Sequence, residues 1–77
     1  MKDFDKAIKR LIEEGYKQLN HQINCVIDRR TLVNNSCDTI DILINIEDGL
    51  SYVSEKYFTL IFDRDGAYVT KIEKKVI

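Results

Sequence analysis

The first twenty residues carry side chains at the spacing of an amphipathic helix. Charged residues fall mostly on one side, and Asp3 and Asp5 at the amino end are suited to cap free amides and to meet the positive end of the helix dipole. The pattern predicts a helix over about residues 3–20, ended by Asn20 and His21. Its inward stripe contains Phe4, Ile8, Leu11, Ile12, Gly15 and Leu19.

From residue 22 the hydrophobic period falls to two, which is typical of half-buried strands. The cleanest alternation occupies residues 40–46, where every second residue is isoleucine. Turn-forming clusters lie at residues 34–36, before this segment, and at residues 47–49 and 63–66, after it. These signals predict an antiparallel meander covering residues 22–33, 38–47, 51–63 and 66–74, with residues 50–56 either strand or loop.

The predicted fold class is α+β, in one domain of residues 1–77. An N-terminal amphipathic helix packs on a three- to four-stranded antiparallel sheet, and the sequence offers no βαβ crossover for a parallel one. Alternation places one face of the sheet under the helix. The expected core contains Ile8, Leu11, Ile12, Ile23, Cys25, Ile40, Ile42, Ile44, Phe58, Leu60 and Phe62.

The last turn predicts a strand register. Asp63 and Gly66 fit a type I turn in which the glycine adopts the left-handed conformation and forms a G1 bulge. Pairing Asp63 with Ala67 then sets the following partners, with Leu60 and Ile61 on opposite faces. The expected pairs are Phe62 with Tyr68, Ile61 with Val69, Leu60 with Thr70, Thr59 with Lys71 and Phe58 with Ile72.

The composition is that of an ordinary globular protein, with 44% hydrophobic residues, 32% charged residues and a formal net charge of −1. The balance argues against a general nucleic-acid binder, which normally has a basic excess. The sequence lacks a hydrophobic run able to span a bilayer or act as a secretory signal, so we expect a cytoplasmic protein without membrane contact. Residues 38–65 hold two basic residues against seven acidic ones, a balance of −5.

Candidate catalytic and redox groups are few. Cys25 and Cys37 show no metal-binding or CxxC spacing, and we expect one buried thiol and one loop thiol, too far apart to form a redox pair. His21 has no nucleophile motif around it and is interpreted as a surface residue at a helix end. We therefore predict no enzymatic activity, unless a homo-oligomer assembles His21 with Asp28 or Glu55 across subunits.

No cofactor or metal is predicted. The Asp63–Gly66 segment resembles the start of a calcium loop, but strand-like residues follow where further oxygen ligands would be required. The three glycines are isolated, so no glycine-rich phosphate loop precedes a helix.

The sheet face turned away from the helix is the predicted binding surface. It combines apolar residues with acidic residues at its rim, a composition typical of a protein contact surface. The alternatives are single exposed residues, or cover provided by Ile72, Val76 and Ile77. The predicted protein-binding residues are Leu43, Tyr57, Ile61 and Val69, with Asp41, Asp48, Asp63 and Asp65.

The leading hypothesis is a small non-enzymatic protein-binding module, an inhibitor or regulator that docks this surface on a nucleic-acid-handling protein. No motif assigns a family, but the small size, absence of proline and Asn-, Ile- and Lys-rich composition are similar in style to inhibitors made by phages and mobile elements. Two alternatives stay open. One is a structural homo-oligomer such as a homodimer, and the other is a nucleic-acid-binding domain using Arg29, Arg30, Lys71, Lys74 and Lys75.

Overall fold

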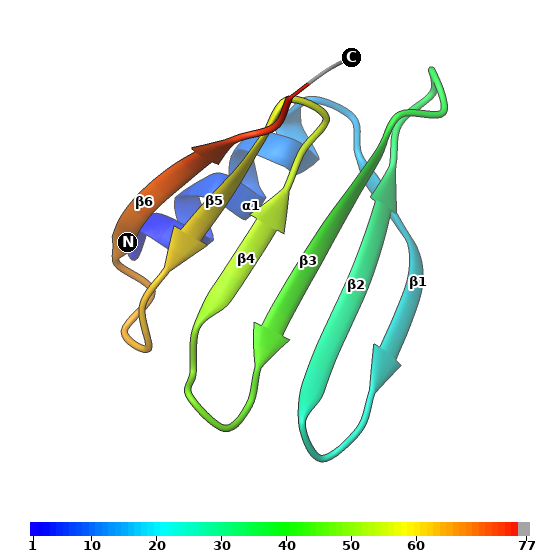
Figure 1. Cartoon of the computed structure of the whole chain (residues 1–77). Coiled ribbons are helices and arrows are strands. Elements are labelled where there is room, and N and C mark those ends of the chain that lie inside the picture. The colour runs from blue at the N-terminus through cyan, green and yellow to red at the C-terminus, as the bar shows by residue number, and fades with distance from the viewer. Residues whose placement is uncertain (76–77) are drawn as a thin grey trace.

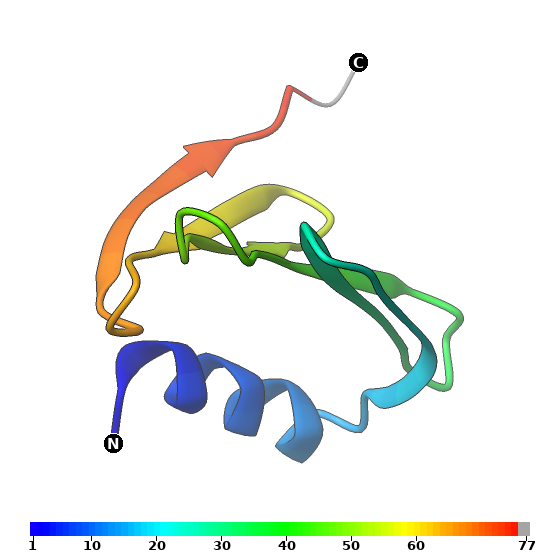
Figure 2. The ribbon, with the colours of Figure 1, turned by 90° about the horizontal axis from the view of Figure 1, so that it is seen from below.

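The computed structural model describes residues 1–75 and contains one helix and a six-stranded antiparallel sheet (Figure 1). Each strand pairs with the next one in the chain, and the helix lies across one face (Figure 2). The predicted α+β class is confirmed, whereas the predicted number of strands, three to four, is wrong. The elements are α1 (Asp3–Glu13), β1 (Lys17–Ile23), β2 (Ile27–Val33), β3 (Thr39–Asn45), β4 (Ser51–Ser54), β5 (Phe58–Phe62) and β6 (Tyr68–Glu73).

The helix ends seven residues earlier than the pattern predicts, because Gly15 terminates it. Gly15 has φ of +93°, a left-handed conformation that glycine adopts without strain. Its amide donates to Ile12 O at 3.0 Å, and the Tyr16 amide donates to Leu11 O at 3.1 Å. These two bonds form a Schellman motif. Gly15 therefore lies outside the helix and does not face inward within it.

The residues that follow Gly15 form an edge strand. Residues 17–23 pair antiparallel with β2, so the predicted helical positions after Glu13 belong to the turn and to β1. Asn24 then turns the chain, because its Oδ1 accepts from the amides of Val26 and Ile27, both at 2.8 Å. The predicted strand over residues 22–33 is therefore split. Cys25 lies in the turn and not in the core.

A third unpredicted turn divides the segment 51–63 into β4 and β5. The Glu55 amide donates to Phe58 O at 2.8 Å, which reverses the chain without glycine, proline or asparagine at the turn. Tyr57 is therefore an exposed turn residue, whereas the period-two pattern predicts it in a strand.

The turn predicted at Asp63–Gly66 is confirmed. Gly66 has φ of +81°, its amide donates to Asp63 O at 2.9 Å, and the Asp63 amide donates to Ala67 O at 2.8 Å. Phe62 pairs with Tyr68 as predicted, but an irregularity at the next step leaves Val69 without a partner. Beyond this bulge the predicted register is wrong by one residue, so that Ile61 pairs with Thr70, Leu60 with Lys71, Thr59 with Ile72 and Phe58 with Glu73.

The core lies between α1 and the central strands. Its buried residues are Leu11, Leu32, Ile40, Ile42, Val53 and Phe62, and Phe4, Ala7, Ile8, Tyr16 and Leu60 pack against them. The predicted core positions Leu11, Ile40, Ile42 and Phe62 are confirmed. Ile8, Ile44, Phe58 and Leu60 are half-buried. Ile12, Ile23 and Cys25 are exposed, contrary to prediction, because α1 covers only part of the sheet and two of these positions lie on the edge strand or in its turn.

Three contacts tie α1 to the β4–β6 half of the sheet. The Phe4 amide donates to Gly66 O at 2.9 Å, and Asp3 Oδ2 accepts from the Tyr68 amide at 2.8 Å. Arg10 Nη2 donates to Glu55 Oε2 at 2.6 Å. Asp3 therefore joins the helix to β6. The prediction that it caps the helix is wrong, because among the described residues no side-chain cap hydrogen bond forms at this end.

Replacing Leu11 with alanine tests how the helix is anchored. Leu11 is fully buried, so we expect Leu11→Ala to lower the free energy of unfolding by about 2–5 kcal/mol. The neighbouring Ile12 is 62% exposed, and we expect Ile12→Ala to lower it by less than about 0.5 kcal/mol. Urea unfolding followed by circular dichroism measures both changes. Equal losses would contradict the orientation of α1.

Candidate functional site

One helix is too narrow to cover one face of this sheet. Strands are spaced by about 4.8 Å, so six of them span about 24 Å, whereas a helix with its side chains is about 10 Å wide. The contacts of α1 hold it on the β4–β6 side. A groove with a volume of about 630 Å³ remains between α1 and the strands β1, β2 and β3.

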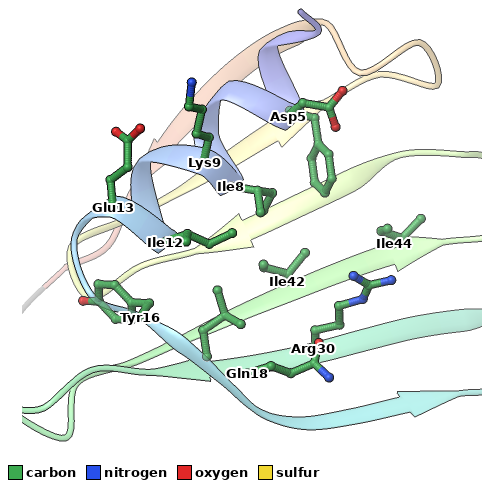
Figure 3. A pocket seen from close by; sticks show the side chains of 12 residues that line it. Asp5, Ile8, Lys9, Ile12, Glu13, Tyr16, Gln18, Arg30, Ile42 and Ile44 are labelled. Atoms are coloured by element: carbon green, nitrogen blue, oxygen red, sulfur yellow. The ribbon is translucent and has the colours of Figure 1, made fainter.

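The surface of this groove is mainly apolar. Ile42 and Ile44 of β3 lie at its floor, while Ile8 and Ile12 line the side formed by α1 (Figure 3). Leu32 of β2 also lines the groove. Ile12 is 62% exposed although it projects toward this apolar surface. An isoleucine in such a position leaves apolar area in contact with water, and contiguous exposed apolar area marks contact surfaces.

The apolar surface extends beyond the groove at the amino end of α1. A second hollow of about 470 Å³ shares Phe4, Asp5 and Ile44 with the groove and continues to the exposed Ile46. Asp63 and Gly49 line this second hollow, so the β5–β6 and β3–β4 turns stand at its end. The two hollows together follow the length of α1.

Charged residues also line the groove. The side chains of Lys9 and Glu13 project away from its floor (Figure 3). Asp5, Lys9 and Glu13 follow one another at four-residue intervals along α1. Arg30 of β2 stands on the opposite side, where its Nε lies 3.6 Å from Asp28 Oδ1. Sequence analysis assigns Ile8, Ile12, Ile42 and Ile44 to the core and Arg30 to a nucleic-acid surface. The sequence signal that points to a groove is Gly15, which shortens the helix.

Tyr16 lies at the carboxyl end of the helix, beside the groove. Burial raises the pKa of the Tyr16 phenol above its ordinary value of 10.0, and the carboxylates of Asp38, Glu14 and Glu55 raise the pKa further, while Arg10 opposes them. The folded protein therefore favours the neutral, protonated form of the phenol.

His21 and Asp28 form a pair within one chain. His21 Nε2 and Asp28 Oδ1 are 2.8 Å apart, across the β1–β2 ladder, so no second subunit is needed to join them. The same carboxylate oxygen lies near Arg30. Within residues 1–75, Asp28 is the one side chain hydrogen-bonded to His21.

The predicted apolar binding residues are only partly brought together. Leu43 and Ile61 lie on the outer face, the face turned away from α1, and both are cross-strand neighbours of Tyr52. Tyr52, which the prediction omits because residues 50–56 were ambiguous, completes this half-buried row. Tyr57 stands apart in the β4–β5 turn and Val69 lies at the bulge. Val76 and Ile77, suggested as cover for this face, lie outside the described residues.

Two of the predicted acidic residues are occupied in forming turns. Asp63 Oδ1 accepts from the amides of Asp65 and Ala67, both at 2.9 Å, and Asp48 Oδ1 accepts from the Leu50 amide at 2.8 Å. Arg64 Nη2 lies 3.4 Å from Asp48 O, so the two turns that carry Asp48, Asp63 and Asp65 are neighbours. Asp41 lies away from them, in the middle of β3.

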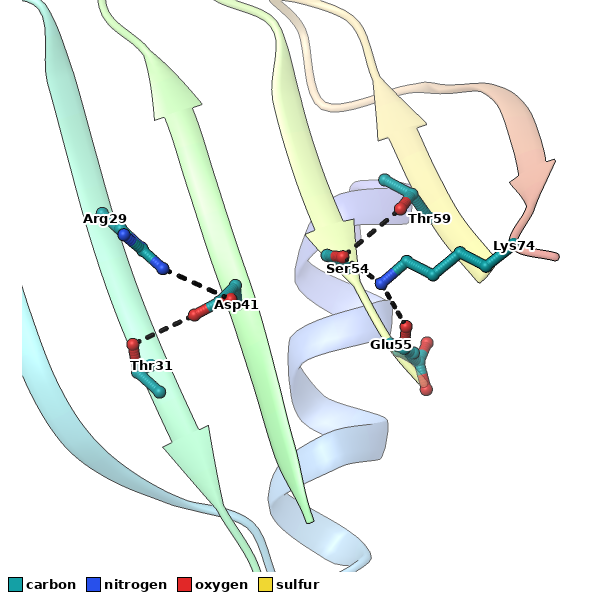
Figure 4. Close-up of polar contacts among 7 residues, drawn as sticks. All are labelled: Arg29, Thr31, Asp41, Ser54, Glu55, Thr59 and Lys74. Carbon is teal, nitrogen blue, oxygen red and sulfur yellow. Dashed lines mark hydrogen bonds and ion pairs between the residues drawn. The ribbon is translucent and has the colours of Figure 1, made fainter. Parts of the chain in front are cut away.

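Several polar residues of the outer face form hydrogen bonds or ion pairs with one another (Figure 4). Asp41 Oδ1 accepts from Thr31 Oγ1 at 3.1 Å, and Asp41 Oδ2 lies 3.4 Å from Arg29 Nη2. Farther along the sheet, Lys74 Nζ donates to Ser54 Oγ at 2.6 Å and to Glu55 O at 2.7 Å. On this face Asp41 is therefore paired with Arg29, whereas the Lys74 ammonium is bound by two neutral oxygens.

The basic residues proposed for nucleic-acid binding do not form one patch. Arg29 and Arg30 are consecutive in β2, so they project to opposite faces of the sheet. Arg29 pairs with Asp41 on the outer face, whereas Arg30 lines the groove. Lys71 lies over the Phe58 ring and near Glu73. A phosphate backbone requires basic residues gathered on one surface.

The remaining candidate groups are dispersed. Cys25 and Cys37 are both exposed, contrary to the expectation of one buried thiol, and they occupy the turns at the two ends of β2. Within the described residues there is no group of three or more His, Cys, Asp or Glu placed to hold a metal ion. No helix in this part of the chain is long and apolar enough to cross a membrane.

Comparison of the chain with protein families, with characterised proteins and with solved structures finds no match. The groove is therefore the basis for an assignment of function.

Titration of Tyr16 is expected to weaken the fold at high pH. Its folded-state pKa is raised, so its contribution to stability is complete below the unfolded value near 10.0 and is lost as the pH rises through the folded value. We expect the free energy of unfolding to fall above pH 10, and less so in Tyr16→Phe. Urea unfolding at a series of pH values measures this. An equally steep fall in Tyr16→Phe would contradict the role of Tyr16.

Proposed function

We propose that this chain is a small non-enzymatic protein-binding module that inhibits or regulates the protein it binds, and that the groove beside α1 is its binding surface. The observation that carries the proposal is the groove itself, about 630 Å³ in volume and bordered by the exposed Ile12. A pre-formed apolar hollow of this size is the usual form of a binding site.

The occupant that fits best is an amphipathic helix of the partner. The half of the sheet beside α1, about 12 Å across by strand spacing, is wide enough for one helix of about 10 Å diameter. Docking the apolar face of a helix into a groove is a common mode of peptide recognition. The hollow that continues toward Ile46 lengthens the surface along α1, which suits an extended occupant better than a small molecule.

The acidic turns support a basic partner surface. Asp63 lines the end of the second hollow, and Asp48 and Asp65 belong to the same pair of turns. A partner helix in the groove would bring its flanking surface against these turns. Such a surface is basic on proteins that handle nucleic acids, so we propose a partner of that class.

Two variants with exposed isoleucines replaced by aspartate test the groove. Ile12→Asp places a charge in the groove, whereas Ile72→Asp places one on β6, at a residue that is 54% exposed. Helical peptides are selected for binding to the wild-type protein from a displayed library, and their affinities for each variant are measured by calorimetry. We expect Ile12→Asp to weaken binding tenfold or more, since burying an isoleucine side chain contributes about 2 kcal/mol.

The matched control Ile72→Asp is expected to retain wild-type affinity, and both variants should retain the circular dichroism spectrum of the wild type. Methyl NMR of isoleucine-labelled protein then locates the bound peptide, with the largest shifts at Ile8, Ile12, Ile42 and Ile44. Shifts confined to Ile61 and Ile72 would contradict the proposal and would favour the outer face.

A further inference from the structure

We propose that the free edge of β1 binds a second copy of this chain. The two β1 strands pair antiparallel about a twofold axis at Gln22, so that two six-stranded sheets join into one. This inference does not rest on the proposed function, because it concerns the backbone edge of the sheet and not the groove beside α1.

β1 is an edge strand whose outer side is free. Within the described residues it pairs with β2 alone, and all seven of its residues are exposed (Figure 1). Two of them are large apolar residues, Leu19 and Ile23, which are 65% and 66% exposed. An edge strand presents a row of N–H and C=O groups that can pair with a strand of another chain.

The hydrogen bonds of the β1–β2 hairpin show which backbone groups of β1 point outward. The Asn24 amide donates to Ile27 O at 2.9 Å. Hydrogen-bonded pairs alternate with non-bonded pairs along an antiparallel ladder, so the register places Gln22 in a bonded pair with β2. The residues on either side of it, His21 and Ile23, therefore direct their N–H and C=O groups away from β2.

Two copies of this segment complement each other. With the twofold axis at Gln22, His21 of each copy lies opposite Ile23 of the other, and Asn20 lies opposite Asn24. His21 and Ile23 exchange both N–H···O=C bonds of their pair, because the outward backbone groups belong to these two residues. Residues 20–24 contain no Lys, Arg, Asp or Glu, so no like charges meet across the new ladder.

The side chains favour the same register. The two copies of Gln22 face each other across the axis as a non-bonded pair, with Cα atoms about 4.5 Å apart, so their amides are able to hydrogen-bond. His21 and Ile23 lie on the face that carries α1, because Arg30, the cross-strand neighbour of His21, lines the groove. The exposed Ile23 therefore packs beside the His21 ring of the other copy and loses contact with water.

The opposite edge of the sheet is protected against such pairing. β6 contains Lys71 and Glu73, and a bulge interrupts its ladder at Val69. Charged side chains and bulges are the usual means by which edge strands avoid pairing. β1 also has an irregularity, but residues 20–23 beyond it keep an unbroken register with β2. Pairing through β1 alone uses the same surface on both copies, so the assembly closes as a dimer.

Dimerisation suits a chain of this size and leaves the groove accessible. Within the described residues six hydrophobic residues are buried, and domains below about 70–80 residues commonly gain stability by association. The twofold axis is perpendicular to the sheet and does not exchange its two faces. Both copies of α1 therefore lie on the same side of the joined sheet, and both grooves open on that side.

A proline at position 23 tests the edge. Ile23→Pro removes an N–H that points outward, so it blocks pairing while the β1–β2 ladder keeps its own hydrogen bonds. We expect the wild type to sediment as a dimer whose fraction rises with concentration, and Ile23→Pro to sediment as a monomer with the wild-type circular dichroism spectrum. The matched control is Glu73→Pro, which removes an outward N–H from β6, because Lys74 donates to Tyr57 O and bonded pairs alternate. This control is expected to stay dimeric.

Charge exchange at the axis tests the register. Gln22→Lys and Gln22→Glu each place two like charges opposite each other, and we expect each variant alone to dimerise about tenfold or more weakly than the wild type at low salt. An equal mixture of the two variants is expected to form a heterodimer, since opposite charges then meet. Thr70→Lys on β6 adds a charge at the other edge and is expected to leave dimerisation unchanged.

The outcomes separate this inference from the proposed function. A wild type that stays monomeric at every concentration would overturn the dimer, and so would a dimer that survives Ile23→Pro or is lost in Ile12→Asp. Failure of the mixed Gln22 variants to form a heterodimer would overturn the register, and this readout decides if Ile23→Pro does not fold. Binding of helical peptides in the groove is measured separately, so the failure of either proposal leaves the other standing.

Discussion

The structure depends on one mismatch of size, because a helix of eleven residues has to cover one face of a six-stranded sheet. Gly15 is the reason both for the short helix and for the wide sheet. The Schellman motif that it closes ends α1 early, and the residues released from the helix become β1, which widens the sheet. A helix continued to residue 20 would remove β1 and with it one wall of the groove. The apolar groove is thus a consequence of where one helix stops.

The position of the groove follows from the contacts that hold α1. Phe4 and Asp3 attach the start of the helix to the β5–β6 turn and to β6, and Arg10 attaches its second half to the β4–β5 turn. All three contacts lie on one half of the sheet, so Leu32 and Ile42 are buried while β1 stays exposed along its whole length. The T-shaped contact between the Phe4 and Phe62 rings, with centroids 5.4 Å apart, reinforces the same attachment.

The sequence predicts those parts of the fold that local chemistry determines. Alternating isoleucines place β3, and the Asp63–Gly66 turn forms as expected because its aspartate and glycine have unique conformational roles. The turn at Glu55–Phe58 contains no such residue, so the strand it divides reads as one. The turn at Asn24 is not predicted, because Ile23, Cys25 and Ile27 alternate by chance with polar residues as they would in a strand. The bulge at Val69, which shifts the last register, has no local signal either.

The candidate site is harder to predict than the fold. Amphipathic spacing identifies which side of α1 faces the sheet, so Ile8 and Ile12 were both expected in the core. It does not determine how much of the sheet the helix covers, which depends on the number of strands and on the contacts that fix the helix. Leu43 and Ile61 were correctly placed on a common face, but Tyr52 between them depends on the strand that ambiguous residues 51–54 form.

The distribution of paired and unpaired charges separates the two faces of the sheet. On the outer face, Asp41 is bound by Arg29 and Thr31, and Lys74 is bound by Ser54 and the Glu55 carbonyl, so a partner there would have to break contacts that the chain already makes. Along α1, the side chains of Asp5, Lys9 and Glu13 form no ion pair within residues 1–75, and those of Lys9 and Glu13 project away from the groove (Figure 3). Apolar burial supplies most of the affinity of a contact, whereas charges at its rim select the partner and speed the encounter. The groove offers the apolar contribution, which is why it is favoured over the outer face.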